Sequence, residues 1–276
     1  MRARLWGTRG SIAVSSADTV RYGGNTAAVE LLCAGGRIIV LDGGSGIRAM
    51  ASNADATTRV DILLSHLHMD HVQGLPFFTP LLDPEVEIHV WGPVSITRTL
   101  RERITRYLSP PLFPVRVREL PNVTFHDVLP GTFELGTIQV TADLISHPGA
   151  TLGYRLEEHG SVLTYMPDHE PALGNADFPD SPEWTSGFAL AEGADVLIHD
   201  AQYDDAEYEA KVGWGHSSTS HLRAFAEMTR PRRLVTFHHD PGHTDTDLDA
   251  LHEGLRADLS NDIELVRGTA NLIVDL

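Results

Sequence analysis

The sequence of 276 residues predicts an α/β (α+β) fold in which two β-sheets pack face to face and helices cover their outer surfaces. Two patterns lead to this prediction. Apolar strand-like runs cluster early in the chain with short helices between them, and the second half repeats this progression towards alternating helices and strands. Hydrophobic residues make up 42% of the chain, enough for a sizeable core. Because no linker separates the halves, we expect one domain, residues 1–276.

The first half is predicted to begin with three antiparallel strands, since apolar runs bounded by glycines are typical of strands joined by turns. A Gly-rich turn after Leu41 is expected to open a short helix that ends at Met50. The expected elements up to residue 108 are strands at 2–6, 27–33, 36–41, 60–64 and 86–91, and an amphipathic helix at 94–108.

Strands continue in the middle of the chain and then alternate with helices. The expected strands are 115–120, 123–126, 137–143, 152–157 and 161–166, and the alternating elements are 187–193, 195–199, 218–229, 233–237, 244–257 and 262–265. Two proline-containing stretches, 108–114 and 171–185, cannot be helix interior. They are either lids over a site or surface loops.

The charge balance limits the size of the partner. Lys plus Arg number 21 against 38 Asp plus Glu, a formal net charge of −17. Such a field repels polyanions, so long nucleic acids are disfavoured unless a local basic patch exists. Divalent cations bound at a site would still admit a small anion there. We therefore expect a small-molecule substrate, and a homodimer is the commonest oligomer to expect.

A cytoplasmic location is the expectation from the ends and the apolar runs of the chain. The segment after Met1 has neither a long apolar run nor a cleavage site, and no run reaches the length of a membrane span. The single cysteine, Cys33, lies in an apolar run and is expected to be a small core residue.

The most informative stretch is Ser65-His66-Leu67-His68-Met69-Asp70-His71, which directly follows the apolar run 60–64. In an extended segment His66 and His68 point the same way, so both can reach one ion. If a helix then begins, Asp70 and His71 are aimed at a second position. Imidazole and carboxylate ligands suit zinc, manganese or iron better than calcium or magnesium.

This His-x-His-x-Asp-His string resembles the signature of the metallo-β-lactamase superfamily. The resemblance implies a four-layer αβ/βα sandwich of two mixed sheets and three further ligands in order, a His, a bridging Asp and a His. The matching positions are His147, Asp168 and His238, each of which closes a strand-like run.

The resemblance also implies two divalent metal ions, with zinc expected first and manganese or iron as alternatives. His66, His68 and His147 would hold the first ion, Asp70, His71 and His238 the second, and Asp168 would bridge them. Two such ions share a hydroxide that attacks at neutral pH. The alternative, a structural zinc site, is usually single and rich in cysteine.

A bridging aspartate instead of the cysteine of some β-lactamases counts against antibiotic hydrolysis and places the chain with other hydrolytic branches. Gly215-His216-Ser217-Ser218-Thr219 resembles a segment of the phosphodiesterase and tRNA 3′-processing endonuclease branches, in which the histidine contacts the scissile phosphate and protonates the leaving oxygen. The catalytic candidates are thus His216 and Asp70. The alternative for His216 is a histidine that bonds a loop carbonyl. The following helix start would offer free N–H groups to a phosphate.

Several other residues near the predicted site have expected roles, some of them with an alternative. The opening of the chain resembles a bacterial cyclic-nucleotide phosphodiesterase-like subgroup, and Arg9 or Asn25 could contact a phosphate there. The favoured reading is that Arg9 packs structurally. Asp42 and Asp200 are expected to orient ligand imidazoles, although Asp42 could equally be a turn residue. His169 and His239 are expected to face away from the metals.

The sequence therefore favours a metal-dependent phosphodiesterase that acts on a small phosphodiester such as a cyclic nucleotide. In this mechanism a metal-bridging hydroxide attacks phosphorus while His216 assists the leaving group. The alternatives are hydrolysis of a carboxylic ester, thioester or lactone at the same site, and a tRNA-processing-type endoribonuclease.

Overall fold

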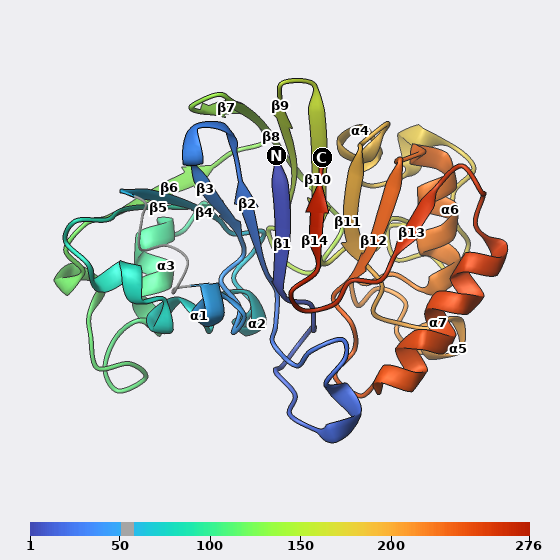
Figure 1. Ribbon diagram of the computed structural model, residues 1–276, viewed down its shortest axis with the longest axis horizontal. Coiled ribbons are helices and arrows are strands. Elements are labelled where there is room, and N and C mark those ends of the chain that lie inside the picture. Colours follow the sequence, from blue (N-terminus) through green and yellow to red (C-terminus); the bar gives the residue numbers. More distant parts are fainter. Residues whose placement is uncertain (51–57) are drawn as a thin grey trace.

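Two seven-stranded sheets form the centre of the computed structural model, which describes residues 1–50 and 58–276 (Figure 1). The first sheet, in spatial order, contains β14 (Ile273–Asp275), β1 (Arg2–Gly7), β2 (Ala28–Leu32), β3 (Ile38–Leu41), β4 (Arg59–Leu63), β5 (Glu87–Pro93) and β6 (Val123–Val128). The second contains β13 (Glu264–Val266), β12 (Arg233–Phe237), β11 (Val196–Asp200), β10 (Ser161–Met166), β9 (Leu152–Glu158), β8 (Ile138–Leu144) and β7 (Gly131–Leu135).

Both sheets are mixed, and each changes from antiparallel to parallel pairing part of the way across. Strands β14, β1, β2 and β3 pair antiparallel, whereas β3, β4, β5 and β6 pair parallel. In the second sheet β7 to β10 pair antiparallel and β10 to β13 pair parallel. The antiparallel arrangement predicted for the first three strands is therefore confirmed.

Helices cover the outer face of each sheet, as Figure 1 shows. The α-helices are α1 (Ile47–Met50), α2 (Met69–Val72), α3 (Leu100–Tyr107), α4 (Phe188–Ala191), α5 (Asp205–Tyr208), α6 (Thr219–Thr229) and α7 (Asp245–Asp258). Short 3₁₀ helices are η1 (Ala17–Thr19), η2 (Ala34–Gly36), η4 (Leu75–Phe77), η5 (Thr79–Leu82), η6 (Val117–Glu119) and η7 (Pro182–Trp184). The first three α-helices lie beside the first sheet and the other four beside the second.

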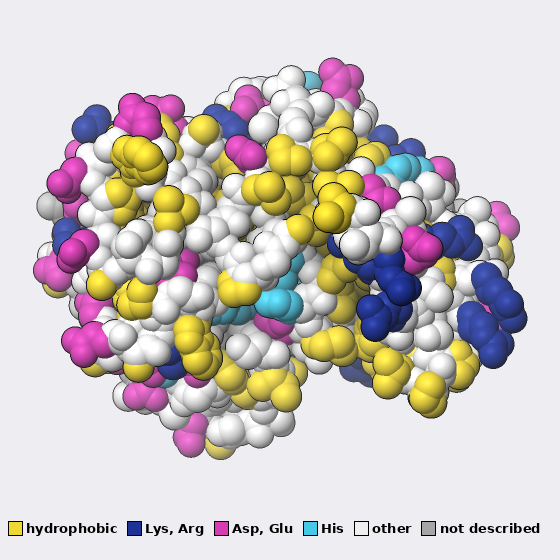
Figure 2. Space-filling view, turned by 180° about the vertical axis from the view of Figure 1, so that it is seen from behind, with side chains coloured by type: hydrophobic (Ala, Val, Ile, Leu, Met, Phe, Trp, Pro, Cys, Tyr) yellow, Lys and Arg dark blue, Asp and Glu magenta, His cyan; other side chains and the backbone are white. Residues whose placement is uncertain are grey.

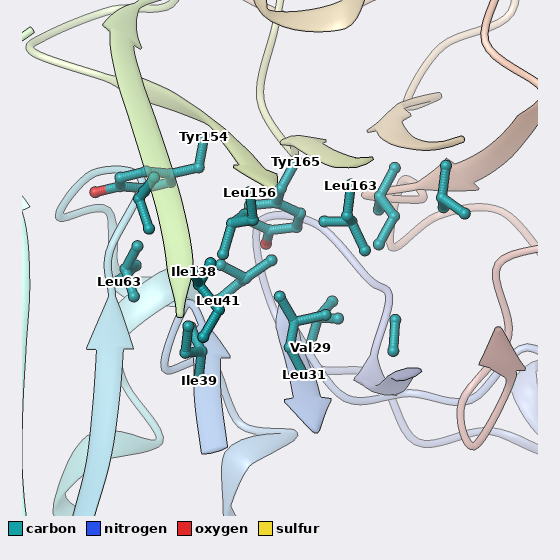
Figure 3. Close-up of a cluster of buried hydrophobic side chains, with 14 of the residues drawn as sticks. Val29, Leu31, Ile39, Leu41, Leu63, Ile138, Tyr154, Leu156, Leu163 and Tyr165 are labelled. Carbon is teal, nitrogen blue, oxygen red and sulfur yellow. The ribbon is translucent and has the colours of Figure 1, made fainter. Parts of the chain in front are cut away.

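Three apolar clusters fill the spaces between these layers. One lies between the two sheets, where side chains such as Leu41 and Tyr165 meet (Figure 3). The second lies between the first sheet and its helices, and the third between the second sheet and α6 and α7. The predicted αβ/βα sandwich of two mixed sheets is therefore confirmed.

Strand β3 shows why a strand between two layers consists of a continuous run of apolar residues. Ile39 and Leu41 point into the space between the sheets, whereas Ile38 and Val40 point towards the outer helices. Successive side chains of a strand face opposite sides, so a strand covered on both faces needs apolar residues at every position.

The structure differs from the predicted elements in several places. Residues 117–119 form the 3₁₀ helix η6 where a strand at 115–120 was expected. The helix expected at 94–108 begins only at Leu100, because Thr99 and Glu102 form a capping box there. Strands β7 and β14 and helix α5 have no counterpart among the predicted elements.

Cys33 is a buried core residue, as predicted, and its thiol has no disulfide partner. Burial raises the pKa of this thiol to about 12, and Glu158 adds to the effect. Among residues 1–50 and 58–276, no helix has the length and apolar character needed to cross a bilayer.

Candidate metal centre

The His-rich stretch leaves the end of β4 and enters α2 within a few residues. His68 has extended backbone angles at the N-cap of α2, and the helix begins at Met69. His66 and His68 thus lie in the extended part, and Asp70 and His71 lie in the helix. This is the change from strand to helix that the spacing of the motif anticipates.

The other candidate residues come from the ends of strands in the second sheet. His147 follows β8, Asp168 follows β10, and His238 follows β12. Strands β10, β11 and β12 are parallel, so their carboxyl ends meet at one edge of the sheet. That edge lies opposite the His-rich loop, and residues far apart in sequence therefore converge.

The convergence produces three groups among the described residues, and the potential ligand atoms of each group lie within 4.8 Å of one another. One group is Asp200, His216 and His238. The other two share Asp168 and are His66, His68, His147 and Asp168, and Asp70, His71, Asp168 and His238. These are the seven ligands expected from the sequence, divided as the resemblance implies. Whether they hold metal ions stays a prediction.

The buried polar atoms of these groups fit divalent cations. Nε2 of His66 and Oδ1 of Asp168 are buried without a hydrogen-bond partner. Nδ1 of His68 lies 3.2 Å from Nε2 of His147. Nε2 of His71 lies 3.3 Å from Nε2 of His238. Lone pairs that converge in this way need a shared cation, and a set of imidazoles and carboxylates favours zinc, manganese or iron.

Hydrogen bonds at the opposite side of each ring aim the imidazoles at this centre. His71 donates from Nδ1 to Asp42 at 2.7 Å, as expected for a carboxylate that orients a ligand. His147 donates from Nδ1 to the carbonyl of Gly215 at 2.8 Å. His238 donates from Nδ1 to Oε1 of Gln202 at 2.8 Å. In each case Nε2 is left facing the other candidate ligands.

Asp42 is an organising residue rather than a simple turn residue. Its fully buried carboxylate also accepts hydrogen bonds from the amide and hydroxyl of Ser65 and from the hydroxyl of Tyr165. The Ser65 hydroxyl in turn lies 3.1 Å from Nδ1 of His66. One carboxylate thus positions two histidines and joins the facing sheets beneath the site.

The electrostatics of the centre divide the histidines into two sets. Burial and neighbouring histidines hold the pKa of His66 well below its usual value, and burial also lowers those of His68 and His147. Burial opposes charge on His71 as well, but Asp168, Asp42 and Asp70 together raise its pKa well above the usual value. The first group is therefore neutral and ready to coordinate a cation.

The carboxylates of the centre stay ionised although they are buried. Burial opposes ionisation of Asp168, but His238 and His71 hold its pKa well below the usual value. The pKa of Asp70 is lowered in the same way by His71 and His238. Anionic carboxylates are suitable ligands for divalent cations. The raised pKa values of His71 and His238, which the neighbouring carboxylates cause against the effect of burial, mean that a bound cation would displace protons from these two rings.

His216 lies beside the two groups, at the start of α6. Its Nδ1 donates to Asp200 at 2.7 Å, and its ring stacks on that of His238 with centroids 5.0 Å apart. Its ring centroid is 4.9 Å from that of His147. The second ring nitrogen has no role in the hydrogen bond to Asp200. Asp200 orients His216 and not a ligand imidazole, which corrects the expectation for this aspartate.

Three backbone amides at the start of α6 already have acceptors, so fewer N–H groups are free there than the sequence led us to expect. The amide of Ser217 donates to Asp200, that of Ser220 to Asp205, and that of His221 to the hydroxyl of Ser218. A phosphate at this position would thus depend more on side chains than on these three amides.

Glu170 is a residue of the site that sequence reasoning missed. Its buried carboxylate accepts hydrogen bonds from the hydroxyl of Tyr208 and from the amides of Gly213 and Gly215. Gly215 has φ +89°, and a Cβ there would lie 2.4 Å from Nδ1 of His147. Glu170 thus fixes this loop. At Gly215, where the loop comes closest to His147, only glycine fits.

We expect Glu170→Gln to lower metal content and hydrolysis by about 10- to 100-fold, the usual effect of losing a partner of a metal ligand. The amide nitrogen that replaces one carboxylate oxygen cannot accept from a backbone N–H, so the loop that orients His147 would move. Metal analysis and turnover would measure this. Tyr208→Phe is the matched control, because it removes one hydroxyl and leaves the carboxylate. Equal effects of the two variants would contradict the prediction.

Other candidates lie outside the centre or face away from it. The Arg9 guanidinium is buried and donates to the carbonyls of Gly23, Asp240 and His243, so its role is structural, as favoured. Asn25 accepts a hydrogen bond from Ser45. The rings of His169 and His239 bond His199 and the Gly268 carbonyl and face away from the ligands, as expected.

Comparison with known proteins agrees with this geometry. Residues 37–239 match the family model described as a beta-lactamase superfamily domain. Ribonuclease BN of Salmonella paratyphi C is 26% identical over 218 residues, which cover 64% of this chain and 69% of the relative.

Two solved structures share the fold over nearly the whole chain. YhfI of Bacillus subtilis, a metallo-beta-lactamase fold protein, is 15% identical with a TM-score of 0.72 and coverage of 99% of both chains. A diphosphatase of the PhnP family is 18% identical with a TM-score of 0.69 and coverage of 100% of this chain and 97% of the other. From the matched family model, the chain belongs to the beta-lactamase superfamily.

Proposed function

We propose that this protein is a metal-dependent phosphodiesterase with two divalent ions, zinc first among the candidates. The observation that carries the proposal is the position of His216 beside two ligand groups that share Asp168. When bound, two such ions supply a nucleophile at neutral pH and neutralise charge on a phosphoryl oxygen. The names of the relatives, a ribonuclease and a diphosphatase, both denote cleavage of phosphorus–oxygen bonds and support this choice.

The residues of the chain would divide the work around a bound phosphodiester. His66, His68 and His147 would hold one ion, Asp70, His71 and His238 the other, and Asp168 would reach both. Asp70 is also kept in place by the amide of Ser11, which donates to its Oδ2 at 2.7 Å. These contacts fix the ligand atoms before substrate binds, which lowers the cost of reaching the reactive geometry.

His216 would hold and deliver the proton of the reaction. Because Asp200 accepts from Nδ1, the other nitrogen, Nε2, can donate a proton to the departing alkoxide oxygen, and Asp200 balances the positive ring before the transfer. Hydrolysis at a carbonyl carbon does not call for a phosphate-contacting imidazole at this loop. The site therefore favours a phosphodiester over a lactone or thioester.

A substrate panel tests the proposal. We expect metal-loaded protein to hydrolyse cyclic nucleotides or bis-aryl phosphodiesters faster than lactones and thioesters. Removal of the metal by a chelator should abolish this activity, and added zinc or manganese should restore it, with metal content measured alongside. Faster turnover of a lactone or thioester, or full activity after metal removal, would contradict the proposal.

The second candidate is an endoribonuclease. It is favoured by the similarity to ribonuclease BN and is tested by adding a tRNA precursor to the same panel.

A further inference from the structure

The segment that contains α3 and the loop after it is basic, although the chain as a whole is acidic. Residues 98–118 contain six of the 21 basic residues of the chain, all arginines, and one glutamate, Glu102. The carboxylate of Glu102 is engaged by Thr99 at the helix start. The net charge of −17 therefore hides a locally basic segment, whose arginines we call the arginine patch: Arg98, Arg101, Arg103, Arg106, Arg116 and Arg118.

Most of these side chains are available to a ligand. All except Arg103 are exposed, and Arg103 is partly buried beside Asp127. Arg101 and Arg106 form no ion pair within residues 1–50 and 58–276, and Arg116 forms only a surface pair with Glu119. A guanidinium with no carboxylate partner is free to bind phosphate with two parallel N–H bonds.

The end of α3 contacts the helix that carries two of the candidate ligands. The hydroxyl of Tyr107, in the last turn of α3, donates to the carbonyl of Gln73 at 3.0 Å. Gln73 is the C-cap of α2, the helix that carries Asp70 and His71. Figure 2 shows histidines in a hollow near the middle of the face, with basic side chains gathered on the half of the molecule that carries α3.

An exposed aromatic ring lies near this junction. Phe77, in η4 shortly after α2, is 56% exposed, and its ring contacts that of Phe113 at a centroid distance of 6.1 Å. Phe113 belongs to the proline-containing stretch 108–114 that follows α3. Exposed rings beside a basic surface are typical of proteins that bind single-stranded nucleic acid, because bases stack on the rings while the cations contact phosphates.

We propose that the arginine patch and Phe77 bind a single-stranded oligonucleotide and guide one of its phosphodiesters to the metal centre. Helix α3 is about 12 Å long at 1.5 Å per residue, so a strand of a few nucleotides spans it. The inference rests on the proposed function and narrows its substrate class from any phosphodiester to an oligonucleotide. It also explains how an acidic protein accepts a polyanion, since a local field decides the approach.

The experiment compares Arg101→Gln/Arg106→Gln with Arg230→Gln/Arg232→Gln, two exposed arginines on the second sheet's side, of which Arg232 pairs with Asp195. Metal-loaded protein is titrated into fluorescent strands of about 12 nucleotides with phosphorothioate linkages, as RNA, as DNA and as a duplex. Anisotropy is read between about 50 and about 200 mM salt. Turnover of a bis-aryl phosphodiester is measured for every variant.

We expect the patch variant to weaken single-strand binding at least about tenfold at low salt and to lower the salt slope by about 1.4, as loss of two phosphate contacts predicts. Phe77→Ala should weaken single-strand binding but not turnover of the small ester. Equal binding by patch and control variants, or a duplex bound as tightly as a single strand, would overturn the inference. If the metal-loaded wild-type protein does not hydrolyse the bis-aryl phosphodiester, the proposed function is refuted instead. The failure of the inference and the failure of the proposed function are therefore distinguishable.

Discussion

Asp168→Asn should release metal from both positions at once. It should also reduce phosphodiester hydrolysis by more than about 100-fold, which is the upper end of the effect of losing a residue that only hydrogen-bonds to a metal ligand. Oδ1 of Asp168 lies 3.0 Å from Nε2 of His71 and 3.3 Å from that of His238, whereas Oδ2 lies 3.7 Å from Nε2 of both His66 and His147. The carboxylate therefore faces both groups. An asparagine side chain has the shape of aspartate but lacks the negative charge that a bridging ligand supplies.

Metal content by mass spectrometry, measured with turnover, checks this result. Asp70→Asn is the informative comparison, because Asp70 belongs to the second group alone and its substitution should spare the first. Asp258→Asn, an exposed change at the end of α7, controls for charge. If Asp168→Asn kept as much metal as Asp258→Asn, the assignment of Asp168 as a shared ligand would fail.

The sequence predicts the candidate centre well because the chemistry of its ligands is local. His66, His68, Asp70 and His71 fall within six residues at the end of an apolar run, where strand and helix periodicity decide their directions. His147, Asp168 and His238 could be placed only through the resemblance to a family. Spacing alone does not reveal which strand ends share a sheet edge.

The parts that sequence reasoning missed depend on tertiary contacts. Gln202 bonds His238 across 36 positions, and Glu170 holds a loop 45 positions away through the Gly215 amide. Strand β14 has three residues and exists because it pairs with β1 at the other end of the chain. No local pattern of hydrophobic residues distinguishes such a strand from an extended tail.

The prediction from net charge concerns the whole surface of the protein. A net charge averages over the whole surface, whereas a ligand experiences the field near its binding site. The arginines of residues 98–118 are gathered by α3 and the chain after it, and they form the kind of local basic segment that the prediction against long polyanions excepted. The distribution of charge became visible only with the fold.

His216→Gln should slow hydrolysis of a cyclic nucleotide or dinucleotide by about 10²- to 10⁴-fold, the range for loss of a general acid, while both metal ions stay bound. The leaving group of these substrates is an alkoxide, which needs a proton as the bond to phosphorus breaks. A 4-nitrophenolate ion leaves without one, so turnover of bis(4-nitrophenyl) phosphate should fall by less than about tenfold. The dependence on the leaving group separates a proton donor from a residue that only shapes the site.

Two further variants sharpen this test. Asp200→Asn removes the anion that balances the charge of His216, and it also places a nitrogen, which cannot accept, where an oxygen accepts N–H bonds. It should therefore show the same dependence on the leaving group, together with a loss that is shared by both classes of substrate. His221→Gln is the matched control, because His221 is a buried histidine in α6 that bonds the Ala176 carbonyl. Metal analysis of each variant accompanies the kinetics. Equal losses on both classes of substrate would show that His216 positions substrate or metal and does not protonate the leaving oxygen.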